Sequence, residues 1–361
     1  MKFTQEQILI ALSEVEDPDF KKDLVTLNMI KDLSFTDDEI KFTIELTTPA
    51  CPLKEQLEND CRNAIAQLVS NEVKVVIDFS SRVTTLRDVK SDILPNVKNI
   101  VTVSSGKGGV GKTTTAVNLA AALAVHGLKV LVIDLDPQGN ASTALGIEHR
   151  LSGTPSSYEV LIGEIPLSEA LQQSPHNKLL FCVPATIDLA GAEIELVSMV
   201  ARENRLRNAL AELDSSDFDY VFIDCPPSLG LLTINALVAA PEVLIPIQCE
   251  YYALEGVSQL MKNIEMVKAH LNPRLDVTTV VLTMYDGRTK LADQVAEEVR
   301  RYFGDKVLRT VIPRSVKVSE APGYSMTIID YDPGSRGALS YLDASREIAE
   351  RGAARGGKGH A

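Results

Sequence analysis

Long apolar segments and paired cysteines are both missing from this 361-residue sequence. No apolar run reaches the roughly 18 residues that a membrane-spanning helix needs, so no such helix is expected. The first residues, MKFTQEQILIALSEVEDPDF, lack the basic-then-apolar layout of a secretory signal, and none is expected. The five cysteines include no C-x-x-C pair, which indicates a reducing compartment such as the cytoplasm. We expect four of them to be small buried apolar side chains: Cys61, Cys182, Cys225 and Cys249.

Positive charge is scarce as well, with 36 basic against 49 acidic residues and a net charge of −13. This balance excludes a protein whose whole surface is positively charged to bind nucleic acid, but it does not exclude a local basic face. Residues 1–96 hold 18 acidic and 11 basic side chains, and residues 97–361 hold 31 and 25. The acid is therefore concentrated at the front of the chain, which indicates a domain boundary near residue 96. The five histidines are scattered, and no nucleophile constellation stands out for the turnover of a small metabolite.

The front of the chain has the pattern of a small α/β domain over residues 1–81. Two helical segments and three strand-like segments alternate there, and the turn residues 36–38 suggest a hairpin. Residues 82–96 are polar, end in Leu-Pro-Asn, and are predicted to be a linker. The expected helices cover 5–15 and 51–69, and the expected strands cover 30–35, 40–46 and 73–79.

From residue 97 the pattern changes to short continuous apolar strands that alternate with helices. Such strands are typical of a parallel sheet covered on both faces, so a doubly wound α/β domain is predicted over 97–350. The tail, 351–361, is rich in Gly and Ala and is predicted to be disordered. It holds no Leu, Ile or Phe and so cannot anchor the chain to a membrane. The expected strands cover 99–103, 129–133, 179–183, 220–223, 243–247 and 277–282, and the expected helices cover 113–126, 202–213, 256–271 and 292–303.

The sharpest signal is a glycine-rich loop between the first of these strands and its helix. It matches G-x-x-x-x-G-K-[ST] fully, in the strand–loop–helix context that this phosphate-binding motif requires. Backbone N–H groups would cradle phosphate, Lys112 would reach the β- and γ-phosphates, and Thr113 would ligate Mg²⁺. The alternative is a glycine-rich turn that happens to fit. The loop comprises Gly106, Lys107, Gly108, Gly109, Val110, Gly111, Lys112 and Thr113.

Acidic residues at later strand ends complete a P-loop NTPase site that takes ATP and Mg²⁺. Asp224 follows a buried strand, where a carboxylate would hold the Mg²⁺ shell, and Asp134 is a second metal candidate. Asp136 could orient a water molecule for attack on the γ-phosphate. Strand-end aspartates can also be mere helix caps or turn formers.

Lys107 lies inside the glycine loop, where the general motif has no lysine. It is either a solvated surface charge or a cation that neutralises charge on the nucleotide of a second subunit, as an arginine finger does in trans.

The stretch Lys107–Thr115, KGGVGKTTT, resembles the deviant Walker A motif of the ParA/MinD ATPases. Segments 134–141, 224–232, 248–256 and 311–322 are similar to chromosomal ParA (Soj) proteins, and the likeness runs over about residues 97–351. The resemblance implies that Lys107 reaches across an ATP-sandwich homodimer and that Asp136 is needed for hydrolysis. It also places Thr114 in the nucleotide loop and Pro313 and Ser315 at the adenine, where relatives commonly have Asn in place of Ser315.

The resemblance further implies a partitioning function. ParA proteins bind non-specific DNA as dimers in the ATP state and release it on slow hydrolysis stimulated by a ParB-like partner, in the cytoplasm on the nucleoid. Arg288 and Lys317 match their DNA-binding positions. The segment between these two residues holds eight basic and four acidic side chains. The alternative is a solvated helix face with incidental charges.

The front domain resembles a different family. Segments 16–18, 46–53 and 94–100 are similar to the N-terminal domain and junction of Mrp-type iron–sulfur carriers, as in a natural fusion or an engineered chimera. An ATP-dependent iron–sulfur carrier is therefore the alternative function, although the Mrp C-x-x-C is missing. Cys51 is either a thiolate activated by a helix N-terminus, which could ligate or pass iron with Asp17 nearby as the resemblance implies, or a buried turn cysteine. A MinD-like membrane-cycling ATPase is a third hypothesis, opposed by the apolar-poor tail.

Overall fold

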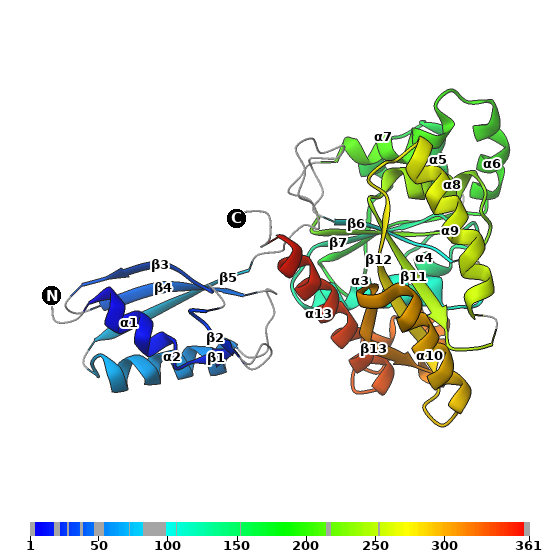
Figure 1. Cartoon of the computed structure of the whole chain (residues 1–361). Helices are drawn as coiled ribbons and strands as arrows, with labels where there is room; N and C mark the ends of the chain where they lie inside the picture. Colours follow the sequence, from blue (N-terminus) through cyan, green and yellow to red (C-terminus); the bar gives the residue numbers. More distant parts are fainter. Residues whose placement is uncertain are drawn as a thin grey trace. The chain divides into compact units, whose positions relative to one another are not determined.

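The computed structural model divides the chain into two compact units, Met1–Val83 and Thr84–Ala361 (Figure 1). No helix among the described residues is long and apolar enough to cross a membrane. The linker predicted over 82–96 lies outside the described residues, as do Cys51 and Gly106. The structure describes residues 4–17, 22–26, 29–36, 39–46, 54–71, 73–81, 99–105, 107–151, 153–213, 218–251 and 253–356.

The smaller unit is the predicted α/β domain, built on a three-stranded sheet of order β3-β4-β5. β3 and β4 pair antiparallel, whereas β4 and β5 pair parallel, so the chain must cross over between them and does so through α2. β1 and β2 form a separate two-stranded pair. The elements are α1 (Gln5–Leu12), β1 (Glu16–Asp17), β2 (Lys22–Asp23), β3 (Ile30–Phe35), β4 (Glu39–Leu46), α2 (Lys54–Leu68) and β5 (Lys74–Ser81).

Alternation in β4 explains how this unit forms a core. Ile40, Phe42 and Ile44 point to one face and are fully buried, while Lys41 between them is exposed. α1 and α2 add fully buried side chains to the same cluster, among them Ile8 and Cys61. The predicted helices and strands are confirmed within the described residues, with ends that differ by a few positions.

The larger unit holds an eight-stranded sheet of order β13-β12-β11-β6-β10-β7-β9-β8. All neighbouring strands are parallel except the short edge strand β8, which pairs antiparallel with β9. This confirms the doubly wound, mostly parallel fold. The strands are β6 (Asn99–Val103), β7 (Val130–Asp134), β8 (Gln172–Gln173), β9 (Leu180–Val183), β10 (Tyr220–Asp224), β11 (Glu242–Gln248), β12 (Asp276–Tyr285) and β13 (Val307–Pro313).

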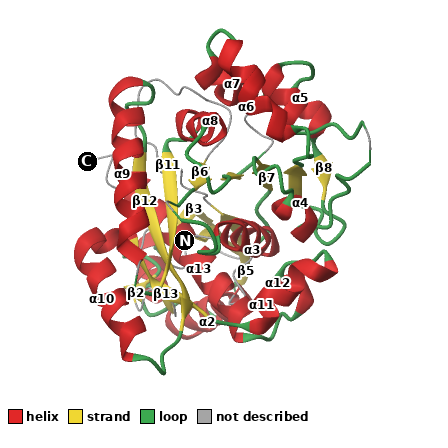
Figure 2. Cartoon of the chain, turned by 90° about the vertical axis from the view of Figure 1, so that its right-hand side faces the viewer, coloured by secondary structure: helices red, strands yellow, loops and turns green. Residues whose placement is uncertain are grey.

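Helices cover both faces of this sheet, which explains why β6, β7 and β10 are buried at every residue. In Figure 2, α5 to α8 lie on one side of β6 and β7, and α3, α12 and α13 lie on the other. The α-helices are α3 (Lys112–Val125), α4 (Asn140–Ala144), α5 (Ser157–Ile162), α6 (Leu189–Ser198), α7 (Arg205–Ala211), α8 (Leu231–Ala239), α9 (Ala253–His270), α10 (Lys290–Phe303), α11 (Val316–Glu320), α12 (Ile328–Tyr331) and α13 (Arg336–Gly356). Four short 3-10 helices cover Leu167–Ala170, Arg202–Asn204, Gly304–Lys306 and Ala321–Tyr324.

The prediction of a disordered tail from residue 351 is corrected as far as Gly356, where α13 ends. The Arg351 guanidinium donates hydrogen bonds to the carbonyl oxygens of Asp305 and Val307, both at 2.7 Å, and to Glu347 at 2.6 Å. These bonds fasten the last turns of α13 beside the start of β13, which composition alone could not indicate. Residues 357–361 lie outside the described residues.

Glu347 joins α13 to β13 from a nearly buried position, with 5% of its side chain exposed. Its carboxylate accepts hydrogen bonds from the backbone N–H groups of Arg309 at 2.8 Å and Thr310 at 3.1 Å, in addition to the bond from Arg351. Burial would raise the pKa of Glu347, but these donors more than offset it, and the pKa lies below its usual range. The charged carboxylate therefore stabilises the packing of α13.

We expect Glu347→Gln to lower the melting temperature of the larger unit by about 4–8 °C, equivalent to about 2 kcal/mol, because buried donors lose a charged acceptor. Asp343→Asn on the same helix is the matched control, since Asp343 is 61% exposed and forms only a 3.9 Å ion pair. Differential scanning calorimetry of the full chain measures both.

The pH dependence follows from the lowered pKa. Because the folded-state pKa lies below the unfolded value of about 4.3, the stabilisation is present above that pH and is lost as pH falls through the folded value. The difference between wild type and Glu347→Gln should therefore narrow below about pH 4. Equal melting temperatures for Glu347→Gln and wild type at neutral pH would contradict this account.

Candidate functional site

The candidate site lies at the carboxyl edge of the sheet, where β6, β10 and β7 end next to one another. The chain leaves β6 through the glycine loop, enters α3 and returns as β7, with β10 between the two strands. The ends of parallel strands share one edge, and a crevice at such a crossover is the usual ligand site of this fold. The topology thus brings the glycine loop, Asp134 and Asp224 to one place.

The glycine loop is shaped to approach an anion through its backbone. Gly109 and Gly111 have φ angles of +77° and +86°, in the left-handed region that favours glycine. A Cβ built on Gly109 would meet no atom within 4 Å, so the space beside it is open. Gly111 directly precedes α3, a helix of 14 residues whose first N–H groups and dipole favour negative charge.

Lys112 places its ammonium group inside the loop. Its Nζ lies 3.3 Å from Ser105 Oγ and 3.5 Å from the carbonyl oxygen of Lys107, and the residue is 7% exposed. Burial lowers the pKa of Lys112, and the negative charge of Asp224 opposes that effect. The ammonium is therefore held near the curl of the loop, whereas the side chain of Lys107 is exposed.

Thr113 and Asp224 form the part of the site that suits a cation. Thr113 Oγ1 donates to Asp224 Oδ2 at 2.7 Å, while Asp224 Oδ1 is buried and has no hydrogen-bond partner among the described residues. Burial raises the pKa of Asp224 well above its usual range, and the neighbouring Asp134 raises it further. An orphaned carboxylate oxygen beside a threonine hydroxyl fits a hard cation with oxygen ligands, so these residues suit Mg²⁺.

Asp134 is the register partner of Asp224 on the adjacent strand, and its carboxylate organises the next loop. Asp134 Oδ1 accepts the N–H of Asp136 at 3.1 Å, and Oδ2 accepts the N–H and hydroxyl of Ser142 at 2.9 and 2.7 Å. Burial raises its pKa to about 6 although these bonds oppose the shift. Ser142, fully buried, also accepts the N–H of Ala185 at 3.1 Å. Ser142 was not predicted from the sequence, where its only signal was a hydroxyl two residues after Gly-Asn.

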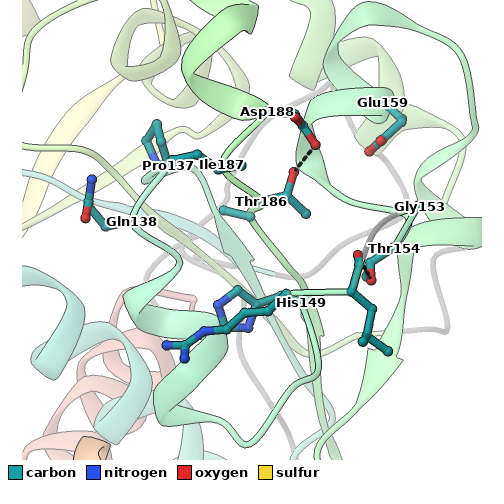
Figure 3. Close-up of a pocket in the computed structure, with 12 residues that line it drawn as sticks. Pro137, Gln138, His149, Gly153, Thr154, Glu159, Thr186, Ile187 and Asp188 are labelled. Carbon is teal, nitrogen blue, oxygen red and sulfur yellow. Dashed lines mark hydrogen bonds between the residues drawn. The ribbon is translucent and has the colours of Figure 1, made fainter.

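A cavity of about 480 Å³ adjoins the loop that carries Asp136 (Figure 3). Pro137 and Gln138 line one side of it, and the segment Ala185–Asp188 after β9 lines another. The Asp136 carboxylate accepts the N–H of Gln138 at 3.0 Å, so the cavity wall and the candidate water-orienting residue are directly bonded. His149 closes the cavity against Gly139, whose added Cβ would lie 2.8 Å from the imidazole ring.

The remaining predicted residues lie at the ends of β12 and β13. Pro313 ends β13 opposite Tyr285 of β12, and Ser315 directly precedes α11 without a capping hydrogen bond from its side chain. Arg288 and Lys317, the predicted DNA contacts, are each bonded to a carboxylate, Arg288 to Asp286 and Lys317 to Asp332. The four cysteines predicted to be buried are buried and free, as expected.

The strand, glycine loop and helix define the larger unit as a P-loop nucleotide-binding domain. A family model described as "AAA domain" matches residues 98–277, and another, described as "Iron-sulfur cluster assembly protein", matches residues 5–77. The second match supports the Mrp-like nature of the N-terminal part.

Known proteins narrow the class. The chain is 53% identical over 253 residues to the sporulation initiation inhibitor protein Soj of Bacillus subtilis, which covers 70% of this chain and 99% of that protein. It is 52% identical over 256 residues to the chromosome partitioning protein ParA of Myxococcus xanthus, which covers 71% and 89%. The chain belongs to the ParA/Soj family of chromosome-partitioning P-loop ATPases.

Solved structures share the fold of the larger unit. A cobyrinic acid a,c-diamide synthase of Mycobacterium smegmatis with bound ATP analog and magnesium has a TM-score of 0.59 at 40% identity, covering 68% of this chain and 92% of that one. A putative plasmid partition protein of Borrelia burgdorferi bound to AMPPNP has a TM-score of 0.60 at 21% identity, covering 70% and 99%, and supports the fold alone.

We expect Gly109→Ala to weaken ATP binding at least about tenfold, because the methyl group enters the open space beside the loop and the backbone is strained at positive φ. Gly304→Ala is the matched control, since Gly304 has a φ of +60° and equally open surroundings but lies at the end of α10. Isothermal titration calorimetry with ATP measures both affinities. Equal effects of the two substitutions would show that backbone strain, and not the phosphate site, is responsible.

Proposed function

We propose that the chain is an ATP-dependent dimerising switch that binds non-specific DNA in its ATP state, releases it on hydrolysis, and acts in chromosome or plasmid partitioning. The observation that carries the proposal is the contrast between two lysines of one loop. Lys112 is buried inside the glycine loop, whereas Lys107 is exposed at its surface. An exposed lysine at that position can reach the nucleotide of a second copy of the chain, so the ATP state favours a homodimer.

Within one subunit, the residues of the loop divide the work of binding ATP. Backbone N–H groups of residues 107–113 receive the phosphates, Lys112 neutralises the β- and γ-phosphates, and Pro313 and Ser315 border the adenine. Thr113 and Asp224 would hold Mg²⁺, with Asp134 behind them, and the bound ion would offset the negative charge of the phosphates. The similar structure at 40% identity, which has a bound ATP analog and magnesium, supports this assignment.

Asp136 is the residue that we assign to hydrolysis. Its backbone N–H is held by Asp134 and its carboxylate by the N–H of Gln138, so the side chain has a defined place at the edge of the site. From there it orients a water molecule toward the γ-phosphate. The reaction is proposed to be slow and to be stimulated by a ParB-like partner, as the resemblance to ParA proteins implies.

DNA binding is assigned to the edge formed by the loops after β12 and β13. Arg288 is 88% exposed and Lys317 is 59% exposed, so both can reach a phosphate backbone. Two copies in an ATP-bound dimer present this edge twice, which couples nucleotide state to DNA affinity. The protein is therefore proposed to act in the cytoplasm on the nucleoid.

The test is the affinity for a non-specific DNA duplex at low salt, with ATP and with ADP. We expect wild type to bind with ATP only and Arg288→Glu to lose at least about tenfold in affinity, because a phosphate contact becomes repulsive. Lys178→Glu is the matched control, since it makes the same charge change at an exposed residue before β9, on the opposite edge of the sheet.

Lys107→Ala should lose both DNA binding and the ATP-dependent rise in mass measured by light scattering. Equal binding with ATP and ADP, or no binding with either, would contradict the proposed switch.

The iron–sulfur function remains a second candidate because of the family match over residues 5–77. The four described cysteines are buried, and no group of described residues forms a metal-binding cluster. Since clusters generally need about four cysteine ligands, we expect anaerobic reconstitution with iron and sulfide to leave the protein colourless. A stable brown protein whose colour is lost in Cys51→Ser would establish the carrier function.

A further inference from the structure

Three cations at the edge assigned to DNA are each paired with a carboxylate. Arg288 donates to both carboxylate oxygens of Asp286, at 2.8 and 2.7 Å. Arg314 donates to Glu250 at 2.6 Å, and Lys317 donates to Asp332. We name these six residues the paired edge: Arg288, Asp286, Arg314, Glu250, Lys317 and Asp332.

Four of the six residues of the paired edge lie at the ends of neighbouring strands, and Lys317 follows three residues after Arg314. Glu250 follows β11, Asp286 and Arg288 follow β12, and Arg314 follows β13, and these three strands are neighbours in the sheet. The N–H of Arg314 donates to the carbonyl oxygen of Tyr285 at 3.0 Å, which fixes the loops after β12 and β13 against each other. The side-chain and backbone hydrogen bonds from Arg288 lower the pKa of Asp286 to about 2, and the positive charge of Arg314 adds a smaller effect. Asp286 is therefore charged under all physiological conditions.

These pairs are exposed enough to open. The cations are 88%, 55% and 59% exposed for Arg288, Arg314 and Lys317. Exposed ion pairs contribute little to stability, so a DNA phosphate can replace the carboxylate at small cost. Until that exchange, each carboxylate cancels the charge that a phosphate would meet.

We propose that Asp286 and Asp332 are internal competitors for DNA phosphate, so that the paired edge is neutral until DNA displaces its carboxylates from Arg288 and Lys317. The inference rests on the proposed DNA-binding function and concerns its regulation. Because the carboxylates cancel the positive charge of the edge, a chain with a net charge of −13 can carry a DNA site that does not bind nucleic acid or other polyanions in every state.

Glu250 connects the paired edge to the nucleotide loop. Its side chain bonds Arg314, and the residue also lines a small pocket with Ser105, Lys107 and Val110 of that loop. Glu250 thus lines the same pocket as the exposed lysine of the loop, while its carboxylate holds a cation of the paired edge. A change in the place of Lys107 on ATP binding would alter the field at Glu250 and, through it, the hold on Arg314.

The test uses Asp286→Asn and Asp332→Asn in the full chain, with ATP, on a non-specific DNA duplex. Asparagine can still accept the N–H of Arg288, which Asp286 accepts at 3.1 Å, so the turn is preserved while the charge is removed. We expect each variant to bind DNA about twofold to fivefold more tightly than wild type. We also expect the slope of log affinity against log salt to steepen by up to about 0.9. In the variant the cation binds a DNA phosphate without leaving behind a carboxylate that takes up a counterion.

Two controls separate this exchange from a general change in charge. Asp276→Asn removes a carboxylate that is paired with Lys268 and Lys306. Asp276 lies at the start of β12, at the other end of the strand from the paired edge, so DNA affinity should be unchanged. Asp286→Asn should have no effect in an Arg288→Gln background, because no cation remains to be freed. ATPase activity without DNA should stay at the wild-type rate in both test variants.

The outcomes distinguish the two proposals. Equal gains from Asp286→Asn and Asp276→Asn, or a gain that survives Arg288→Gln, would overturn the competition while leaving DNA binding intact. Wild-type binding with no gain in either variant would overturn it as well. If neither wild type nor any variant binds DNA with ATP, the proposed function itself fails, and the competition fails with it.

Discussion

The larger unit depends on two carboxylates buried side by side. Asp134 and Asp224 face each other in register at the ends of β7 and β10, both fully buried, and burial together with the neighbouring Asp134 raises the pKa of Asp224. Unpaired charges are costly to bury, so the surrounding donors are a requirement of the fold. Ser142 and the N–H of Asp136 satisfy Asp134, while Thr113 satisfies one oxygen of Asp224. The remaining oxygen, Asp224 Oδ1, has no hydrogen-bond partner among the described residues, and a bound cation would satisfy it. The same atom therefore matters both for the stability of the buried carboxylates and for nucleotide binding.

Carboxylates also lie near the cations at both places where phosphate is proposed to bind. The edge proposed for DNA holds its cations in ion pairs with carboxylates, and in the nucleotide loop the charge of Asp224 acts on Lys112. At the edge proposed for DNA, the carboxylates occupy the positions that phosphates would take. DNA binding there would exchange one anion for another, which costs less than exposing a bare cation and makes the binding sensitive to salt.

Features that depend on residues close together in the sequence were predicted correctly. The glycine loop, the central strands and the β4 alternation follow from local spacing, and the structure confirms them. Three features escaped because they depend on residues far apart in the chain. Ser142 matters through Asp134 and Ala185, the last turns of α13 are held by Arg351 against β13, and Lys317 meets Asp332 across 15 residues. β13 was missed because polar Arg309 and Thr310 interrupt its apolar run, and Glu347 of α13 accepts their N–H groups.

In the proposed cycle, ATP hydrolysis that depends on Asp136 ends the DNA-bound state. The most direct measurement loads the protein onto immobilised DNA with ATP, removes free nucleotide, and follows dissociation for wild type and Asp136→Ala. The account predicts that wild type leaves at its own rate of hydrolysis, whereas Asp136→Ala remains bound for many times longer. Equal dissociation of the two proteins, at a rate unrelated to hydrolysis, would contradict it.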